Sequence, residues 1–118
     1  MARVLIVEDN EMDRLSLEAI LEKPGHELYF ASNGDEARLL YGQQSIDVVV
    51  TDLHMEPGHG LELIQALTAS DPEAAIIIVS GTGPAQLDMA LSLGARLAFP
   101  KPVDAQRLLA AVEEASSD

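Results

Sequence analysis

The chain has 118 residues, of which 47% are hydrophobic and only 3% aromatic, so its core has to be built from aliphatic side chains. A formal net charge of -13 opposes unaided contact with nucleic acid or an anionic membrane surface, whereas it favours the capture of cations. The absence of cysteine excludes disulfides, thiolate zinc sites and thiol nucleophiles, and no apolar run approaches the ~18 residues of a membrane span, so we expect one cytoplasmic domain over residues 1–118.

Five apolar runs predict strands, and they alternate along the chain with five segments of helical period. In chain order, the strands cover residues 4–7, 26–31, 46–50, 75–79 and 97–99, and the helices cover 12–23, 33–41, 61–70, 84–93 and 103–115. All the strands except 26–31 look buried on both faces. Such alternation indicates a parallel sheet with helices on both faces. We therefore expect an α/β fold of the flavodoxin-like (βα)5 type, a three-layer sandwich with the sheet order 2-1-3-4-5.

Residues that favour helix ends support these boundaries. Asn33 is suited to cap the second helix, and the acidic pair that follows Gly34 suits its first turn. Pro84 is tolerated in the first turn of the fourth helix, and Gly94 is suited to end that helix.

Polar residues stand at the ends of four of the predicted strands. Glu8 and Asp9 follow the first strand, and Asp52 follows the third after one intervening threonine. Ser80 follows the fourth strand, and Lys101 lies just beyond the fifth. Ligands of an open parallel sheet bind beyond the carboxyl ends of its strands. In the expected strand order these side chains would converge on one spot.

Three carboxylates on one spot repel one another and raise at least one pKa unless a cation enters. Mg²⁺ meets this need, because it prefers oxygen ligands in octahedral geometry. Lys101 and Ser80 then offer a charge and a hydroxyl donor to a phosphoryl oxyanion. Asp52 is placed as a carboxylate nucleophile that can form an aspartyl phosphate. Any one of these residues could be an ordinary helix cap or a solvated charge, and it is their combination that favours a site.

Several short motifs are arranged along the chain in a specific order. They are residues 4–10, residues 52–55 with Gly60, residues 79–81, Gly94-Ala95 and Lys101-Pro102. Together they resemble the receiver domain of two-component response regulators, over essentially the whole chain. The resemblance implies that Asp52 is the phosphoacceptor, Ser80 the switch hydroxyl and Lys101 the lysine that pairs with the phosphoryl group. It also implies Mg²⁺ bound directly by Asp9, by Asp52 and by the backbone carbonyl of His54, with Glu8 acting through water.

The resemblance further implies the partners of the chain. A sensor histidine kinase or a histidine phosphotransfer protein would donate the phosphoryl group, and a downstream protein target or a fused output domain would respond. Such a domain catalyses only its own phosphorylation and dephosphorylation. The alternative is a Mg²⁺-dependent aspartyl-phosphate phosphohydrolase with the same nucleophile. Hydrolases of the haloacid dehalogenase class carry a second aspartate two residues after the first, where this chain has His54.

The chain departs from the receiver pattern where the signal is usually transmitted. Ala98 stands three residues before Lys101, where the family has a Tyr or Phe that turns inward upon phosphorylation. Phe99 cannot replace it, because neighbouring residues of a strand face opposite sides. We therefore expect the signal to pass from Ser80 through residues 81–83 into the fourth helix. On that helix, Met89 and Leu93 are either partly buried or part of an exposed patch that faces a partner.

Overall fold

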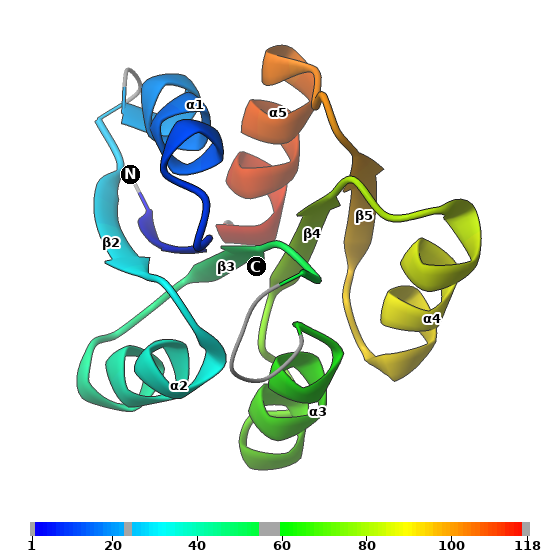
Figure 1. The fold of residues 1–118 in the computed structure, drawn as a ribbon. Coiled ribbons are helices and arrows are strands. Elements are labelled where there is room, and N and C mark those ends of the chain that lie inside the picture. The colour runs from blue at the N-terminus through cyan, green and yellow to red at the C-terminus, as the bar shows by residue number, and fades with distance from the viewer. Residues whose placement is uncertain (1, 23–24, 55–59, 117–118) are drawn as a thin grey trace.

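The computed structural model describes residues 2–22, 25–54 and 60–116, in which strands and helices alternate (Figure 1). The strands are β1 (Arg3–Val7), β2 (Glu27–Ala31), β3 (Val48–Thr51), β4 (Ile76–Ser80) and β5 (Leu97–Pro100). The helices are α1 (Glu11–Glu22), α2 (Gly34–Gln43), α3 (Gly60–Ser70), α4 (Pro84–Leu93) and α5 (Ala105–Ser116). Every predicted element is present, with ends that differ by a residue or two. None of the helices within these ranges is both long and apolar enough to span a lipid bilayer.

The sheet has the order β2-β1-β3-β4-β5, and all neighbouring strands run parallel. This confirms the predicted order and the flavodoxin-like fold. β1 pairs with both β2 and β3, so the chain reverses its direction of winding beside β1. Because all strands point the same way, the residues that follow them leave the sheet at a single edge.

Helices cover both faces of the sheet (Figure 1). α1 and α5 pack on one face, where Leu17 and Leu108 lie in one buried cluster with strand residues such as Ile6. α2, α3 and α4 pack on the other face, where Ile64 lies in one cluster with Leu5. Successive residues of β1 therefore face opposite layers, as alternation along a strand requires. The buried core consists of aliphatic side chains, as the composition predicts.

Two of the predicted helix ends have the expected geometry. The Asn33 side chain accepts a hydrogen bond of 2.8 Å from the backbone N–H of Glu36 at the start of α2. Gly94 follows α4 with a φ of 125°, a conformation that favours glycine. A Cβ at Gly94 would also lie 2.8 Å from Cγ2 of Thr68, so a larger residue there would disturb the contact with α3.

β5 is less buried than its apolar sequence predicts. Leu97 is 41% exposed, and Ala98 and Phe99 are half-buried. The prediction that residues 97–99 are buried on both faces is wrong, because β5 is the last strand of the sheet and pairs with β4 alone. Ala98 and Phe99 face opposite layers as predicted, since they pack against different core clusters.

Most residues of α4 are also partly or fully exposed. Within Pro84–Leu93, all of which the structure describes, only Ala90 is buried. Met89 is 52% exposed and Leu91 is 42% exposed. Met89 thus faces outward, whereas Leu93 is half-buried and packs against the core. The exposed patch is therefore found at Met89 and partial burial at Leu93, and Leu91 is exposed beside Met89.

Candidate functional site

The backbone of each strand-end residue continues the hydrogen bonding of the sheet. The Glu8 N–H donates to the Ala31 carbonyl at 3.0 Å, and the Asp52 N–H donates to the Val7 carbonyl at 3.1 Å. The Lys101 N–H donates to the Ser80 carbonyl at 2.9 Å. The sheet therefore sets the positions of these residues, although they lie at or beyond the ends of the strands.

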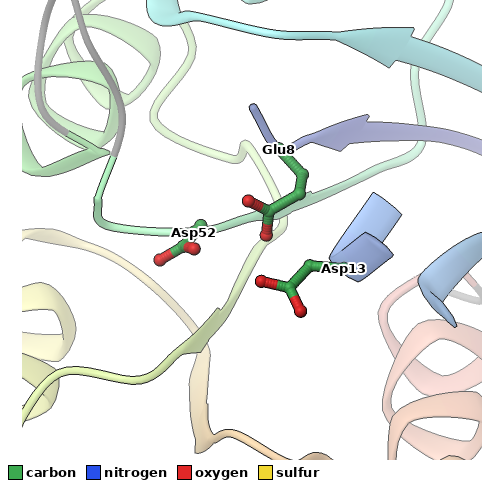
Figure 2. Close-up of side chains that lie close together, drawn as sticks. All are labelled: Glu8, Asp13 and Asp52. Carbon is green, nitrogen blue, oxygen red and sulfur yellow. The ribbon is translucent and has the colours of Figure 1, made fainter. Parts of the chain in front are cut away.

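Three carboxylates approach one another at this edge (Figure 2). Glu8, Asp13 and Asp52 each offer an oxygen atom, and these atoms lie within 4.8 Å of one another. Glu8 and Asp52 are 2% and 5% exposed, whereas Asp13 is only half-buried. Such a set of hard oxygen donors is consistent with binding a divalent cation.

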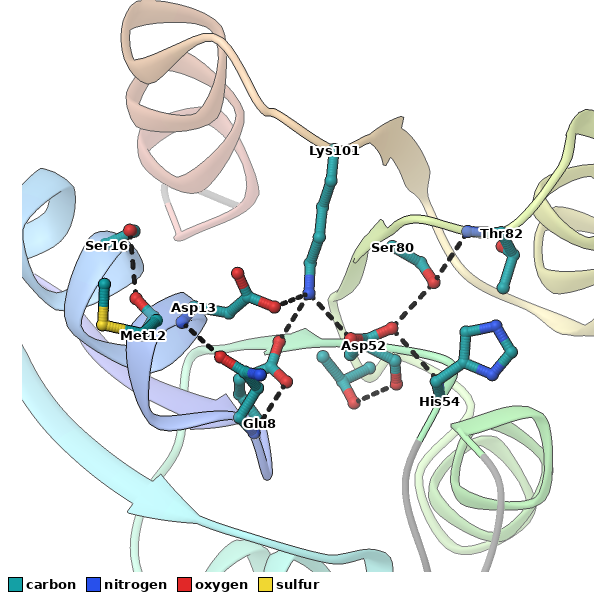
Figure 3. Close-up of polar contacts among 11 residues, drawn as sticks. Glu8, Met12, Asp13, Ser16, Asp52, His54, Ser80, Thr82 and Lys101 are labelled. Atoms are coloured by element: carbon teal, nitrogen blue, oxygen red, sulfur yellow. Dashed lines mark hydrogen bonds and ion pairs between the residues drawn. The ribbon is translucent and has the colours of Figure 1, made fainter.

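The Lys101 ammonium lies among these three carboxylates (Figure 3). Its Nζ is 2.7 Å from Asp13 Oδ2, 2.8 Å from Asp52 Oδ2 and 2.9 Å from Glu8 Oε1. The Ser80 hydroxyl donates to Asp52 Oδ1 at 2.7 Å. The structure thus brings together Glu8, Asp52, Ser80 and Lys101, as the strand order predicts.

Both oxygens of Asp52 are held by donors. Oδ1 accepts hydrogen bonds from the Ser80 hydroxyl and, at 3.0 Å, from the His54 backbone N–H. Oδ2 accepts from Lys101. These bonds fix the orientation of the carboxylate at the mouth of the site, and they also meet the requirement that a buried polar group be paired.

Gly60 allows the loop that carries Asp52 to lie against α3. The Gly60 N–H donates to the Leu53 carbonyl at 3.1 Å. A Cβ at Gly60 would collide with the backbone carbonyl oxygen of Asp52 and with the Cα of Leu53. The glycine of the predicted motif is therefore required by the close approach of two backbone segments.

Sequence reasoning missed Asp13. It lies in the first turn of α1, and its N–H donates to the Asn10 side chain at 3.0 Å. The site was predicted from residues at strand ends, and Asp13 is not one of them. The available signal was an acidic residue in the first turn of the helix that follows Glu8. Asp9, the predicted direct Mg²⁺ ligand, is exposed and lies outside the set of three carboxylates, and its role and that of the His54 carbonyl stay predictions.

The environment shifts the pKa values of the two buried carboxyls in opposite directions. Burial raises the pKa of Glu8 to about 7, although hydrogen bonds from Lys101 and the Asn10 N–H oppose the rise. Burial would also raise the pKa of Asp52, but hydrogen bonds from Lys101, the His54 N–H and Ser80 outweigh it and lower that pKa. One carboxyl pKa is therefore raised as predicted, chiefly by burial and only secondarily by repulsion from Asp52.

The carboxylates around Lys101 change the pKa of its ammonium group. Burial would lower the pKa of Lys101, but its hydrogen bonds to Asp13, Asp52 and Glu8 outweigh this and raise that pKa. At neutral pH the site therefore holds an ionised Asp52 beside a cationic Lys101. A nucleophilic carboxylate, a fixed cation and a hydroxyl donor are the groups that a transferred phosphoryl group requires.

Comparisons with known proteins agree with this arrangement. The sequence profile of the response regulator receiver domain matches residues 4–113. Protein PilH of Pseudomonas aeruginosa is 37% identical over 112 residues, which cover 92% of this chain and 93% of PilH. Chemotaxis protein CheY of Thermotoga maritima is 34% identical over 116 residues, 97% of each chain. A receiver domain protein from Clostridium thermocellum has a similar structure, with a TM-score of 0.90 and 31% identity over 99% of this chain and 95% of that one.

Proposed function

Since this chain belongs to the response regulator receiver domain family of two-component systems, we propose that it accepts a phosphoryl group on Asp52 from a partner's phosphohistidine. The observation that carries this proposal is the buried Asp52 carboxylate, held between Lys101 and Ser80 at 2.8 and 2.7 Å. An Asp52 oxygen attacks phosphorus, and an O–P bond forms while the N–P bond to imidazole breaks. The imidazole leaves with the electron pair of that bond and takes up a proton.

Mg²⁺ is the cofactor that we propose. The carboxylates of Glu8 and Asp52 are hard oxygen donors of the kind that this ion prefers, and the -13 net charge favours cation capture. Asp9 and the His54 carbonyl are the further donors that we predict. When bound, Mg²⁺ would neutralise carboxylate charge and draw charge from the phosphoryl oxygens.

Lys101 and Ser80 contact Asp52 directly, so both can respond to its phosphorylation. Once an Asp52 oxygen is phosphorylated, the carboxyl loses its negative charge, and the Lys101 ammonium can pair with phosphoryl oxygens instead. The Ser80 hydroxyl can turn from Asp52 Oδ1 to the same oxygens. Ser80 Oγ also accepts the Thr82 N–H at 3.4 Å, which links the hydroxyl to the loop before α4. We propose that this loop, in place of an aromatic residue at Ala98, carries the signal.

The partners are proposed by class. Receiver domains as a family interact with histidine kinases or phosphotransfer proteins and with downstream targets. We propose that this chain receives its phosphoryl group from one of these donors in the cytoplasm, and that it passes the signal to a protein target or a fused output domain. It would catalyse only its own phosphorylation and dephosphorylation. The profile match does not favour the phosphohydrolase alternative.

Phosphorylation by a small donor tests the proposal. The chain is incubated with Mg²⁺ and acetyl phosphate or carbamoyl phosphate, and its intact mass is measured. We expect one added phosphoryl group that hydroxylamine removes, and we expect Asp52→Asn to abolish it. Asp35→Asn, at an exposed position in the first turn of α2, serves as the control and should be modified like the parent.

Two results would contradict the proposal. One is an Asp52→Asn protein that is phosphorylated as fully as the parent, because the acceptor would then be another residue. The other is continuous release of phosphate from a phosphomonoester by the parent, which would favour the phosphohydrolase.

A further inference from the structure

The Lys101 ammonium has no spare hydrogen-bond donor at this site. A lysine ammonium carries three N–H groups. Glu8, Asp13 and Asp52 each accept one bond from Lys101 Nζ, at distances of 2.9, 2.7 and 2.8 Å (Figure 3). A phosphoryl oxygen that pairs with Lys101 therefore has to replace one of these carboxylates.

Two of the three carboxylates change when the site is used. Phosphorylation removes the negative charge of the Asp52 carboxylate and replaces it with that of the phosphoryl oxygens, which then lie beside Lys101. A cation that enters the site attracts Glu8, whose side chain is 1% exposed and has little alternative solvation. Asp13 is neither phosphorylated nor fully buried, so its carboxylate stays available to Lys101 before and after phosphorylation of Asp52.

Asp13 contacts the Lys101 ammonium from the side opposite to Asp52, and the two carboxylates belong to different parts of the fold. Asp13 and Asp52 flank the Lys101 ammonium in Figure 3, with Asp13 on α1 and Asp52 after β3. The Asp13 side chain is 42% exposed, whereas that of Asp52 is 7% exposed. A half-exposed ion pair is weak enough to be exchanged, since solvent screens it. The 2.7 Å contact nevertheless engages one N–H of the ammonium on the α1 side, while Asp52 Oδ2 lies 2.8 Å from the same nitrogen.

We propose that Asp13 is a positioning residue that competes with the phosphoryl group for the Lys101 ammonium. This inference rests on the function proposed above. While Asp13 holds Lys101, fewer N–H donors are available to the phosphoryl oxygens. Asp13 therefore weakens the binding of phosphoryl groups, slows the phosphorylation of Asp52 and shortens the lifetime of the product.

Substitution of Asp13 tests this competition. Asp13→Asn keeps the shape of the side chain and removes its charge. At saturating Mg²⁺, we expect it to bind beryllofluoride, a phosphoryl mimic, about two- to fivefold more tightly than the parent, the upper part of the range expected for loss of one partly screened charge contact. Phosphorylation by acetyl phosphate should become faster by a similar factor. Asp13→Glu, which retains the carboxylate, should return both quantities toward those of the parent.

A matched control separates this contact from a general effect of charge. Glu11→Gln removes one negative charge from the same first turn of α1 at an exposed position that is not among the Lys101 contacts. We expect beryllofluoride affinity to change less than twofold in this variant, given the screening of exposed charges. Mg²⁺ affinity is measured for each variant, so that saturation is ensured. Circular dichroism checks that each variant is folded.

The outcomes distinguish the inference from the proposed function. If Asp13→Asn binds beryllofluoride no more tightly than Glu11→Gln does, Asp13 does not compete for Lys101, and the inference is wrong while phosphorylation at Asp52 stands. Weaker binding by Asp13→Asn than by the parent also overturns the inference. A parent that neither takes a phosphoryl group on Asp52 nor binds beryllofluoride overturns the proposed function and this inference together.

Discussion

The strand ends that form the site differ in burial and hydrogen bonding from the outer edge of the molecule, which β5 and α4 form. At the site, Glu8, Asp52 and Ser80 are buried, and the side chain of each has a hydrogen-bond partner. At the outer edge, the apolar side chains of Leu97 and Met89 are 41% and 52% exposed. A reaction centre needs preset geometry, whereas a surface that responds to phosphorylation has to be free to move. This difference is consistent with the proposal that the strand ends carry the chemistry and the outer edge carries the signal.

The largest expected effect is a change in the free energy of unfolding. It is tested at two residues that are paired across β4 and β5. Ile77 is fully buried, and its partner in the strand register, Leu97, is 41% exposed. Ile77→Ala should lower the free energy of unfolding by about 3 to 4 kcal/mol, because it leaves a cavity in the core. Leu97→Ala should lower it by about 1 kcal/mol or less, since much of that side chain already contacts water. Urea unfolding measures both. Equal losses would mean that the outer edge is packed as firmly as the interior.

The second effect is a pH dependence that arises at the site. Burial raises the pKa of Glu8 from 4.5 to about 7, so the folded protein holds this proton more tightly than the unfolded chain does. The Glu8 contribution to the free energy of unfolding is therefore favourable at low pH and is lost as the pH rises from 4.5 to about 7. Glu8→Gln cannot ionise, and it should be about 2 kcal/mol more stable than the parent near pH 8.

Urea unfolding of both proteins at several pH values measures this difference. It should shrink as the pH falls toward 4.5, where Glu8 is protonated in the folded state. Parallel pH profiles for the two proteins would show that burial does not raise the Glu8 pKa.

A smaller effect on the free energy of unfolding is expected when Mg²⁺ binds. Mg²⁺ at ten times its Kd should raise the free energy of unfolding by about 1.4 kcal/mol, as any ligand of the native state does. Asp9→Ala should remove most of this gain, because we predict that Asp9 binds the ion directly. Asp88→Ala, at an exposed position on α4, is the control and should keep the gain. Thermal unfolding with and without Mg²⁺ measures it. A full gain in Asp9→Ala would place the cation elsewhere.

The smallest effect is the conformational change at the outer edge. With a phosphoryl mimic bound, amide NMR shifts or hydrogen exchange should change most in residues 81–93, because Ser80 contacts the Thr82 N–H in the loop before α4. Residues 97–99 should change less, since Ala98 has no ring that could turn inward. The largest changes at residues 97–99, with 81–93 unaltered, would show that the signal takes the usual path despite Ala98.

The sequence by itself determined the fold and the reacting groups, because both follow from short-range patterns. Apolar runs that alternate with segments of helical period leave few arrangements other than a parallel sheet between two layers of helices. A polar residue just after a buried parallel strand has to emerge at the carboxyl edge of the sheet. Asp52, Ser80 and Lys101 could therefore be placed together before any contact was known, and the Asn33 cap could be identified from four neighbouring residues.

Two features depend on tertiary structure alone. One is the contact of a third carboxylate, that of Asp13, with Lys101, and the other is the exposure of the outer strand β5. Asp13 lies inside a helix, and no local pattern indicates that its carboxylate meets a lysine 88 positions further along the chain. Leu97 belongs to an apolar run much like that of Ile77, and only its place on the last strand of the sheet leaves it exposed. Both features depend on which distant segments pack together, and the burial that raises the Glu8 pKa depends on the same packing.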